Sequence, residues 1–164
     1  MLRRALRLIR TQEPYWQIAW LNPDIAIGSV ARAEDWRHVY GAGVRAIVDL
    51  RDDPGDLGAV VRNEGMRYLR LCLRQGITPG PEEMHIVTGW LCDRNSSEGP
   101  VMIQDVGCVN NDGLLACAAL IRTGLTYDLA MQALERVRPE TALTYDQASA
   151  LLRFTAEIAT PDES

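Results

Sequence analysis

The chain alternates between short apolar runs and longer segments in which apolar residues recur every three or four positions. Short apolar runs bounded by turn residues are typical of buried strands, and the recurring pattern is typical of helices with one buried face. The predicted strands span residues 25–27, 46–48, 68–73 and 101–103. The predicted helices span residues 33–42, 57–64, 81–94, 113–122, 127–136 and 145–158.

Strands that alternate with helices along a chain predict an α/β fold. We expect a three-layer sandwich in which helices flank a central, mostly parallel sheet. The helix over residues 113–122 is apolar almost all round, as a helix in the centre of a core is. Because ligands of such folds bind beyond the carboxyl ends of the strands, the loop over residues 104–112 is the default site.

The composition indicates one soluble domain and excludes several functions. The chain has 164 residues, of which 47% are hydrophobic, and its formal net charge is −5. This acidic balance argues against general binding of nucleic acid. All 17 basic side chains are Arg, and the absence of Lys excludes Schiff-base chemistry and a phosphate-loop lysine. No apolar run is long enough to span a bilayer.

The two ends of the chain differ from its middle. Residues 1–14 form a basic leader in which Arg7 and Arg10 interrupt the apolar residues, so a secretory signal is not expected. A short amphipathic helix packed on the domain, or a mobile leader, is the preferred interpretation, and a membrane-surface helix is the alternative. We expect a single domain over residues 15–158 and a mobile tail over residues 159–164.

The cysteine pattern carries no metal signature. The 4 cysteines form no C-x-x-C pair, and the histidines, His38 and His85, lie far apart in the sequence. Neither a metal nor another cofactor is therefore expected. Without an export signal, we expect a cytoplasmic protein with free thiols, most of them buried as small apolar groups.

Several segments between residues 15 and 155 follow a pattern known from one enzyme family. They span residues 22–28, 33–36, 43–51, 67–71 and 99–113, and are followed by Arg138-Pro139 and by Thr144-x-x-Gln147. Together they resemble the dual-specificity and protein-tyrosine branch of the cysteine-based phosphatases, in particular its small bacterial members. The resemblance implies the same fold, with the catalytic loop between a central strand and a buried helix.

In that family the loop C-x5-R-[S/T] forms a cradle for phosphate. Its backbone N–H groups bind the anion at a helix N-terminus. The Cys thiolate attacks phosphorus, and the Arg binds two phosphate oxygens. An Asp from a separate loop protonates the leaving group.

This sequence departs from the family pattern at each catalytic position. An alignment without gaps places Asp105 at the nucleophile, Asn111 at the loop arginine and Gln75 at the general acid. Gln cannot protonate a leaving group. The rest of the degenerate loop consists of Gln104, Val106, Gly107, Cys108, Val109, Asn110 and Asp112.

Two acidic residues in the loop, Asp105 and Asp112, lower its expected affinity for phosphate. A second negative charge about 4 Å away costs ~4 kcal/mol at an effective dielectric of about 20, which is roughly a thousandfold in affinity. No basic residue occurs between Asn95 and Ile121. We expect the carboxylate of Asp105 to occupy the cradle itself and to accept its backbone N–H bonds.

These changes favour a catalytically inactive pseudophosphatase that serves as a binding or scaffolding module. Its protein partner is unknown; phosphate and phosphoprotein binding are disfavoured, and a cationic group or a surface away from the cradle fits better. The alternative is an active phosphatase that hydrolyses phosphomonoesters with displaced or non-standard groups. Cys108 could be a displaced nucleophile, whereas an aspartyl-phosphate mechanism at Asp105 lacks the second Asp that Gly107 replaces. A third interpretation is a purely structural domain.

Overall fold

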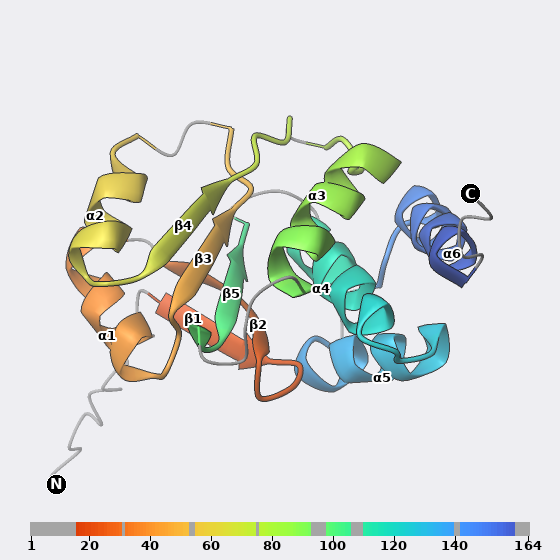
Figure 1. Ribbon diagram of the computed structural model, residues 1–164, viewed down its shortest axis with the longest axis horizontal. Helices are drawn as coiled ribbons and strands as arrows, with labels where there is room; N and C mark the ends of the chain where they lie inside the picture. The colour runs from red at the N-terminus through yellow and green to blue at the C-terminus, as the bar shows by residue number, and fades with distance from the viewer. Residues whose placement is uncertain are drawn as a thin grey trace, which may run out of the picture.

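The computed structural model describes residues 16–30, 32–52, 55–74, 76–92, 98–105, 110–139 and 142–159. Within these residues, a five-stranded sheet lies between two groups of helices (Figure 1). The strands are β1 (Trp16–Trp20), β2 (Ile25–Val30), β3 (Ala46–Asp49), β4 (Arg67–Arg70) and β5 (Val101–Gln104). The helices are the 3-10 helix η1 (Ala33–Asp35), α1 (Trp36–Gly41), α2 (Leu57–Asn63), α3 (Pro81–Cys92), α4 (Asn111–Arg122), α5 (Tyr127–Val137) and α6 (Tyr145–Ala159).

The sheet is mostly parallel, as the sequence predicts. Its strand order is β1-β2-β5-β3-β4. β2, β5, β3 and β4 run parallel, and β1 pairs antiparallel with β2. In this register Gln104 at the end of β5 pairs with Asp49 of β3 and with Gly28 of β2. Polar residues from neighbouring strands therefore meet at the carboxyl edge of the sheet.

The two faces of the sheet bury separate apolar clusters. One cluster includes Trp36 and Val39 of α1 and Val61 of α2. The other is centred on α4, whose residues from Asn111 to Ile121 are all buried, and it also contains side chains from α3, α5 and α6. Each fully buried Leu contributes roughly 1.5–3 kcal/mol to stability, so the burial of α4 contributes strongly to this cluster. The packing of α4 therefore also fixes the position of its N-terminus, where the loop over residues 104–112 ends.

The structure corrects the predicted elements at three places. β1 was not predicted, although it pairs with β2 so closely that a Cβ at Gly28 would lie 2.2 Å from the carbonyl oxygen of Gln17. β4 ends at Arg70 instead of residue 73, and α4 begins at Asn111 instead of residue 113. The predicted leader, and the predicted tail beyond Ala159, lie outside the described residues.

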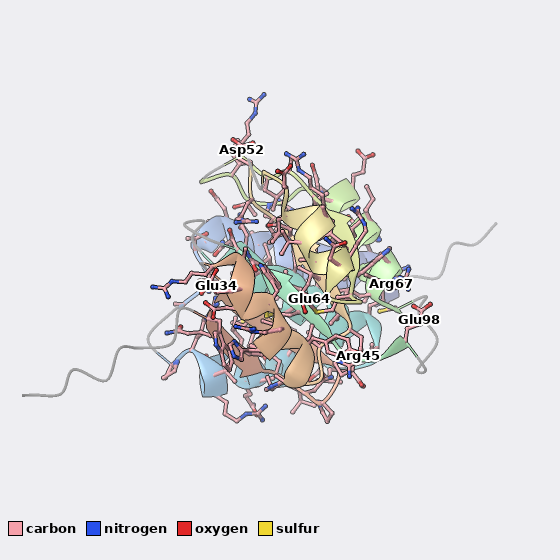
Figure 2. All side chains as sticks on the ribbon, turned by 90° about the vertical axis from the view of Figure 1, so that its left-hand side faces the viewer. Glu34, Arg45, Asp52, Glu64, Arg67 and Glu98 are labelled. Carbon is pink, nitrogen blue, oxygen red and sulfur yellow. The ribbon has the colours of Figure 1, made fainter. Side chains whose placement is uncertain are left out.

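The edge strand β4 carries charged side chains. Arg67 forms an ion pair with Glu98 (Figure 2), and its guanidinium carbon lies 5.2 Å from the centre of the Trp90 ring. Arg70 donates a hydrogen bond to the carbonyl oxygen of Asp52 at 3.0 Å. Charges on an edge strand oppose pairing with a strand of another molecule.

In the described part of the chain, no helix is both long and apolar enough to cross a membrane.

Candidate functional site

The loop over residues 104–112 connects the central strand β5 to the buried helix α4, as expected. Gln104 is the last residue of β5 and is completely buried, and Asp105 follows it with 8% of its surface exposed. On the other side of the loop, Asn110 precedes α4 in the left-handed conformation, with φ 61°. Asn tolerates this conformation better than most residues do. The loop thus begins on a fully buried strand and ends on a helix whose residues from Asn111 to Ile121 are all buried.

Asp112 is held by an ion pair that sequence reasoning did not foresee. Arg138 donates to both carboxylate oxygens, from Nη1 to Oδ1 at 2.8 Å and from Nη2 to Oδ2 at 2.7 Å. The same Nη1 donates to Oδ1 of Asn110 at 3.0 Å. The expectation that Asp112 adds an uncompensated negative charge to the loop is therefore wrong, because Arg138 neutralises it from the end of α5. The only sequence signal was the Arg138-Pro139 pair within the family pattern.

Asn111, which the alignment without gaps places at the loop arginine, points into the protein. Its Nδ2 donates to the carbonyl oxygen of Ile77 at 2.9 Å, and its Oδ1 accepts from Nε2 of Gln147 at 3.0 Å. Only 2% of its surface is exposed. Asn111 therefore ties the start of α4 to the segment before α3 and to α6.

Thr144 and Gln147 form a capping box at the start of α6. The backbone N–H of Gln147 donates to Oγ1 of Thr144 at 3.2 Å, and Oε1 of Gln147 accepts from the backbone N–H of Thr144 at 2.9 Å. This reciprocal arrangement fixes the Gln147 side chain. Its Nε2 is then directed to Asn111, so one glutamine both caps α6 and holds the Asn111 side chain.

A second polar cluster lies beside Gln104 at the carboxyl edge of the sheet. Asp49 is completely buried, and it accepts from Nε and Nη2 of Arg51, both at 3.0 Å, and from the hydroxyl of Tyr68 at 2.9 Å. Burial, together with this hydrogen bond to Asp49, raises the pKa of Tyr68 well above its ordinary value. The amide of Gln104 itself makes no hydrogen bond within the described part of the chain.

Five of the predicted site residues lie outside the described residues. They are Gln75, which the alignment places at the general acid, and the middle of the loop, Val106, Gly107, Cys108 and Val109. Their roles stay predictions.

The histidines lie on helix surfaces, away from the loop. Nε2 of His85 is 3.0 Å from a carboxylate oxygen of Glu157, and Nδ1 of His38 is 3.5 Å from a carboxylate oxygen of Asp35.

Burial raises the pKa of the Cys117 thiol to about 12, so this cysteine is not a nucleophile at neutral pH. The described residues contain no group of three or more His, Cys, Asp or Glu side chains that could hold a metal.

Comparison with known proteins supports the fold. The sequence matches no protein-family model, and no curated protein is a significant match to it. Solved structures are similar. Tk-PTP in its active form has a TM-score of 0.75 at 20% identity, covering 85% of this chain and 96% of that chain. PTPMT1, solved in complex with PI(5)P, has a TM-score of 0.75 at 16% identity, and the match covers 88% of this chain and 97% of that chain.

Human DUSP28 is a third similar structure, with a TM-score of 0.73 at 18% identity, covering 87% of this chain and 95% of that chain. The three structures match nearly their whole length, so the likeness concerns the complete domain and not one motif. The chain therefore has the α/β fold of the dual-specificity and protein-tyrosine phosphatases.

Proposed function

We propose that this chain is a pseudophosphatase, a protein with a phosphatase fold that binds a partner and does not hydrolyse phosphate esters. The observation that carries the proposal is the state of Asn111. It replaces the loop arginine, is 2% exposed, and both ends of its amide are bonded within the protein. A neutral side chain used in this way cannot bind two phosphate oxygens as an arginine does.

The charges around the loop support the same proposal. Asp105 stands where the family has its nucleophilic cysteine, and its carboxylate repels an incoming phosphate. Arg138, a cation that contacts the C-terminal end of the loop, already binds Asp112 through two hydrogen bonds. A phosphate would therefore have to displace an existing ion pair, or bind without a cation. Both routes disfavour phosphate and phosphoprotein ligands in this loop.

The direct test is hydrolysis of a generic aryl phosphate by the purified protein, across pH and with and without Mg²⁺. We expect no turnover above the buffer blank. Asp105→Ala and Cys108→Ala are assayed in parallel, because they remove the two candidate nucleophiles. Turnover in the wild type that either substitution abolishes would overturn the proposal and establish the active-phosphatase alternative.

A restored variant provides the complementary test. Asp105→Cys, Asn111→Arg and Gln75→Asp together reinstate the nucleophile, the loop arginine and the general acid of the family. We expect this triple variant to gain activity, and the matched variant that keeps Asn111 to gain none. If the triple variant fails even to bind vanadate, the loop backbone has also diverged from the family.

A further inference from the structure

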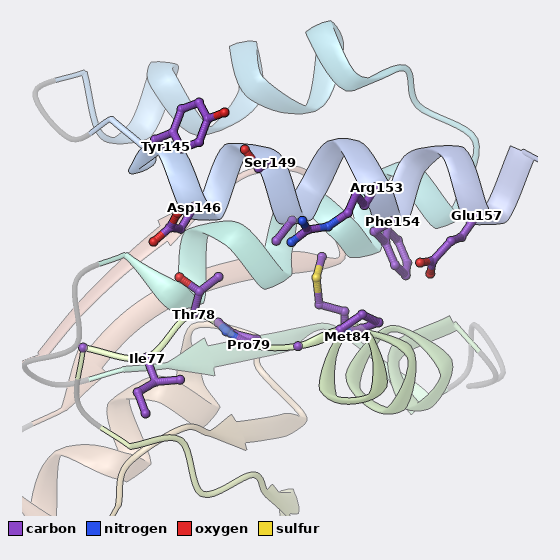
Figure 3. A pocket seen from close by; sticks show the side chains of 14 residues that line it. Ile77, Thr78, Pro79, Met84, Tyr145, Asp146, Ser149, Arg153, Phe154 and Glu157 are labelled. Atoms are coloured by element: carbon purple, nitrogen blue, oxygen red, sulfur yellow. The ribbon is translucent and has the colours of Figure 1, made fainter.

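A groove runs along α6 on the side that faces residues 76–80 and the first turns of α3 (Figure 3). Its volume is about 560 Å³. Met84 and Phe154 form part of its floor and are almost completely buried, whereas Ile77 and Tyr145 at its rim are 52% and 86% exposed. The lining combines apolar side chains with polar ones such as Thr78 and Ser149, and the volume falls in the range of ligand sites.

The groove begins beside the degenerate loop. A smaller cavity of about 220 Å³ adjoins it, shares Ile77 and Asp146 with it, and is also lined by Asn111. Through its hydrogen bonds to Ile77 and Gln147, Asn111 joins the two walls of the groove at this end. The walls are therefore fixed before anything binds, which lowers the entropy lost on binding.

Two opposite charges face the groove from α6. Asp146 and Arg153 lie on the same side of this helix, two turns apart, or about 10 Å along its axis. Neither side chain makes a hydrogen bond or ion pair within the described part of the chain. A third charged residue, Glu157, is already engaged by His85. The groove therefore presents one acidic and one basic group to a ligand, and apolar side chains such as Ala150 and Met84 lie among its other lining residues.

We propose that this groove docks an extended peptide segment of a protein partner. The segment carries a basic residue that faces Asp146 and an acidic residue that faces Arg153, with apolar residues between them. In an extended chain, which rises about 3.3 Å per residue, two residues three positions apart span roughly 10 Å. This spacing matches that of the two charges on α6.

The length and the charges of the groove select this occupant over others. The lining residues of α6 extend from Tyr145 to Glu157, roughly 18 Å along the helix, which suits a peptide better than a small metabolite. A uniformly acidic ligand would meet Asp146, and a uniformly basic one would meet Arg153. The inference deepens the proposed function and rests on it, because it names the docking surface of a module that binds without turnover.

The test uses three acetylated and amidated tetrapeptides, Arg-Leu-Leu-Glu, Glu-Leu-Leu-Glu and Arg-Leu-Leu-Arg, titrated into the full chain. Binding is followed by NMR through the methyl groups of Met84 and Ile77. We expect the mixed-charge peptide to bind about tenfold more tightly than either uniform peptide. Equal binding of the three peptides, or no methyl shift at millimolar peptide, would overturn the proposal.

A charge reversal makes the test specific to the groove. In Arg153→Glu the peptide with two arginines becomes the preferred ligand, again by about tenfold. The matched control is Arg37→Glu, which reverses an exposed charge on α1, on the other face of the sheet. It leaves the order of the three peptides unchanged. If both reversals, or neither, change the preferred peptide, charge recognition by the groove is refuted.

Aryl phosphate hydrolysis is measured in the same samples, so that the two proposals can fail separately. Absence of peptide binding together with absence of turnover refutes the groove and leaves the pseudophosphatase proposal standing. Peptide binding together with turnover that depends on Asp105 or Cys108 refutes the pseudophosphatase and leaves the docking surface.

Discussion

Gln104 and Asn111, near the two ends of the loop over residues 104–112, are in opposite hydrogen-bonding states. At its C-terminal end, Asn111 binds the segment before α3 and α6, and Asp112 binds Arg138. At its N-terminal end, Gln104 is completely buried, and its amide makes no hydrogen bond within the described part of the chain. Both Gln104 and Asn111 are polar side chains inside the protein, but only Asn111 has hydrogen bonds for its amide in the described part of the chain.

The difference in hydrogen bonding distinguishes Asn111 and Asp112, which stabilise the fold, from Gln104, which does not. A buried polar group without a partner costs about 1–3 kcal/mol, whereas a satisfied one contributes about 1 kcal/mol. The hydrogen bonds of Asn111 and Asp112 at the start of α4 therefore explain these two residues by stability. Gln104 is not explained in this way. Substitutions at the two ends should consequently change the free energy of unfolding in opposite directions.

The largest effect is expected from breaking the Asp112–Arg138 ion pair. Arg138→Ala leaves the carboxylate of Asp112 buried without its cation, and should lower the free energy of unfolding by ~3 kcal/mol. Urea denaturation measures the change. Adding Asp112→Ala should recover part of the loss, because it removes the isolated charge. A loss within about 0.5 kcal/mol, as at an ordinary surface position, would show that the pair does not hold the loop.

Asn111→Ala should have the next largest effect. It removes two hydrogen bonds and leaves the carbonyl oxygen of Ile77 and Nε2 of Gln147 without this partner, so we expect a loss of ~2 kcal/mol in the same denaturation experiment. The matched control is Asn63→Ala on the exposed end of α2, which should change stability by no more than about 0.5 kcal/mol. Equal effects of the two substitutions would contradict a structural role for Asn111.

Tyr68→Phe perturbs the satisfied cluster that flanks Gln104, and should cost ~1.5 kcal/mol at neutral pH through the lost hydrogen bond to Asp49. Because burial and this bond raise the pKa of Tyr68 in the folded state, its contribution is complete below the unfolded-state pKa near 10 and is lost as pH rises beyond it.

Wild-type stability should therefore fall above about pH 10 by more than that of Tyr68→Phe. Urea denaturation at a series of alkaline pH values measures the difference. Tyr145→Phe serves as the control because Tyr145 is 86% exposed. The same alkaline profile in Tyr68→Phe and the wild type would contradict the assigned hydrogen bond.

Gln104→Met should give the smallest effect and the opposite sign. It replaces the buried amide with an apolar side chain of similar shape, so we expect stability to rise by ~1 kcal/mol. Chemical denaturation again measures it, with Gln17→Met on β1, which is exposed, as the control. A loss of stability comparable to that of Asn111→Ala would remove the contrast between the two ends of the loop.

Much of the fold could be predicted because its central strands are fully buried. The apolar runs at residues 25–27, 46–48 and 101–103 lie within β2, β3 and β5, since parallel strands covered on both faces read as continuous apolar runs. β1 escaped prediction because it is an edge strand with half-exposed side chains, where the hydrophobic signal is weak. The ends of β4 and α4 depend on tertiary packing, which a local pattern does not contain.

The candidate site could be located from the sequence, but its contacts could not. The strand, loop and helix order placed it at residues 104–112. The partners of Asn111 and Asp112 lie 34, 36 and 26 residues away along the chain, and hydrogen bonds over such separations leave no local pattern. Counting charges within the loop therefore missed Arg138, and reading Asn111 as a lost arginine missed its structural role.

The central claim is that the start of α4 binds other parts of the protein instead of an oxyanion. The most direct test is a vanadate titration of the wild type, followed through the backbone amide signals of Asn110, Asn111, Asp112 and Gly113. These N–H groups would surround an anion bound at the N-terminus of α4. We predict no saturable shift at millimolar vanadate. Saturable shifts confined to these four amides would contradict the claim.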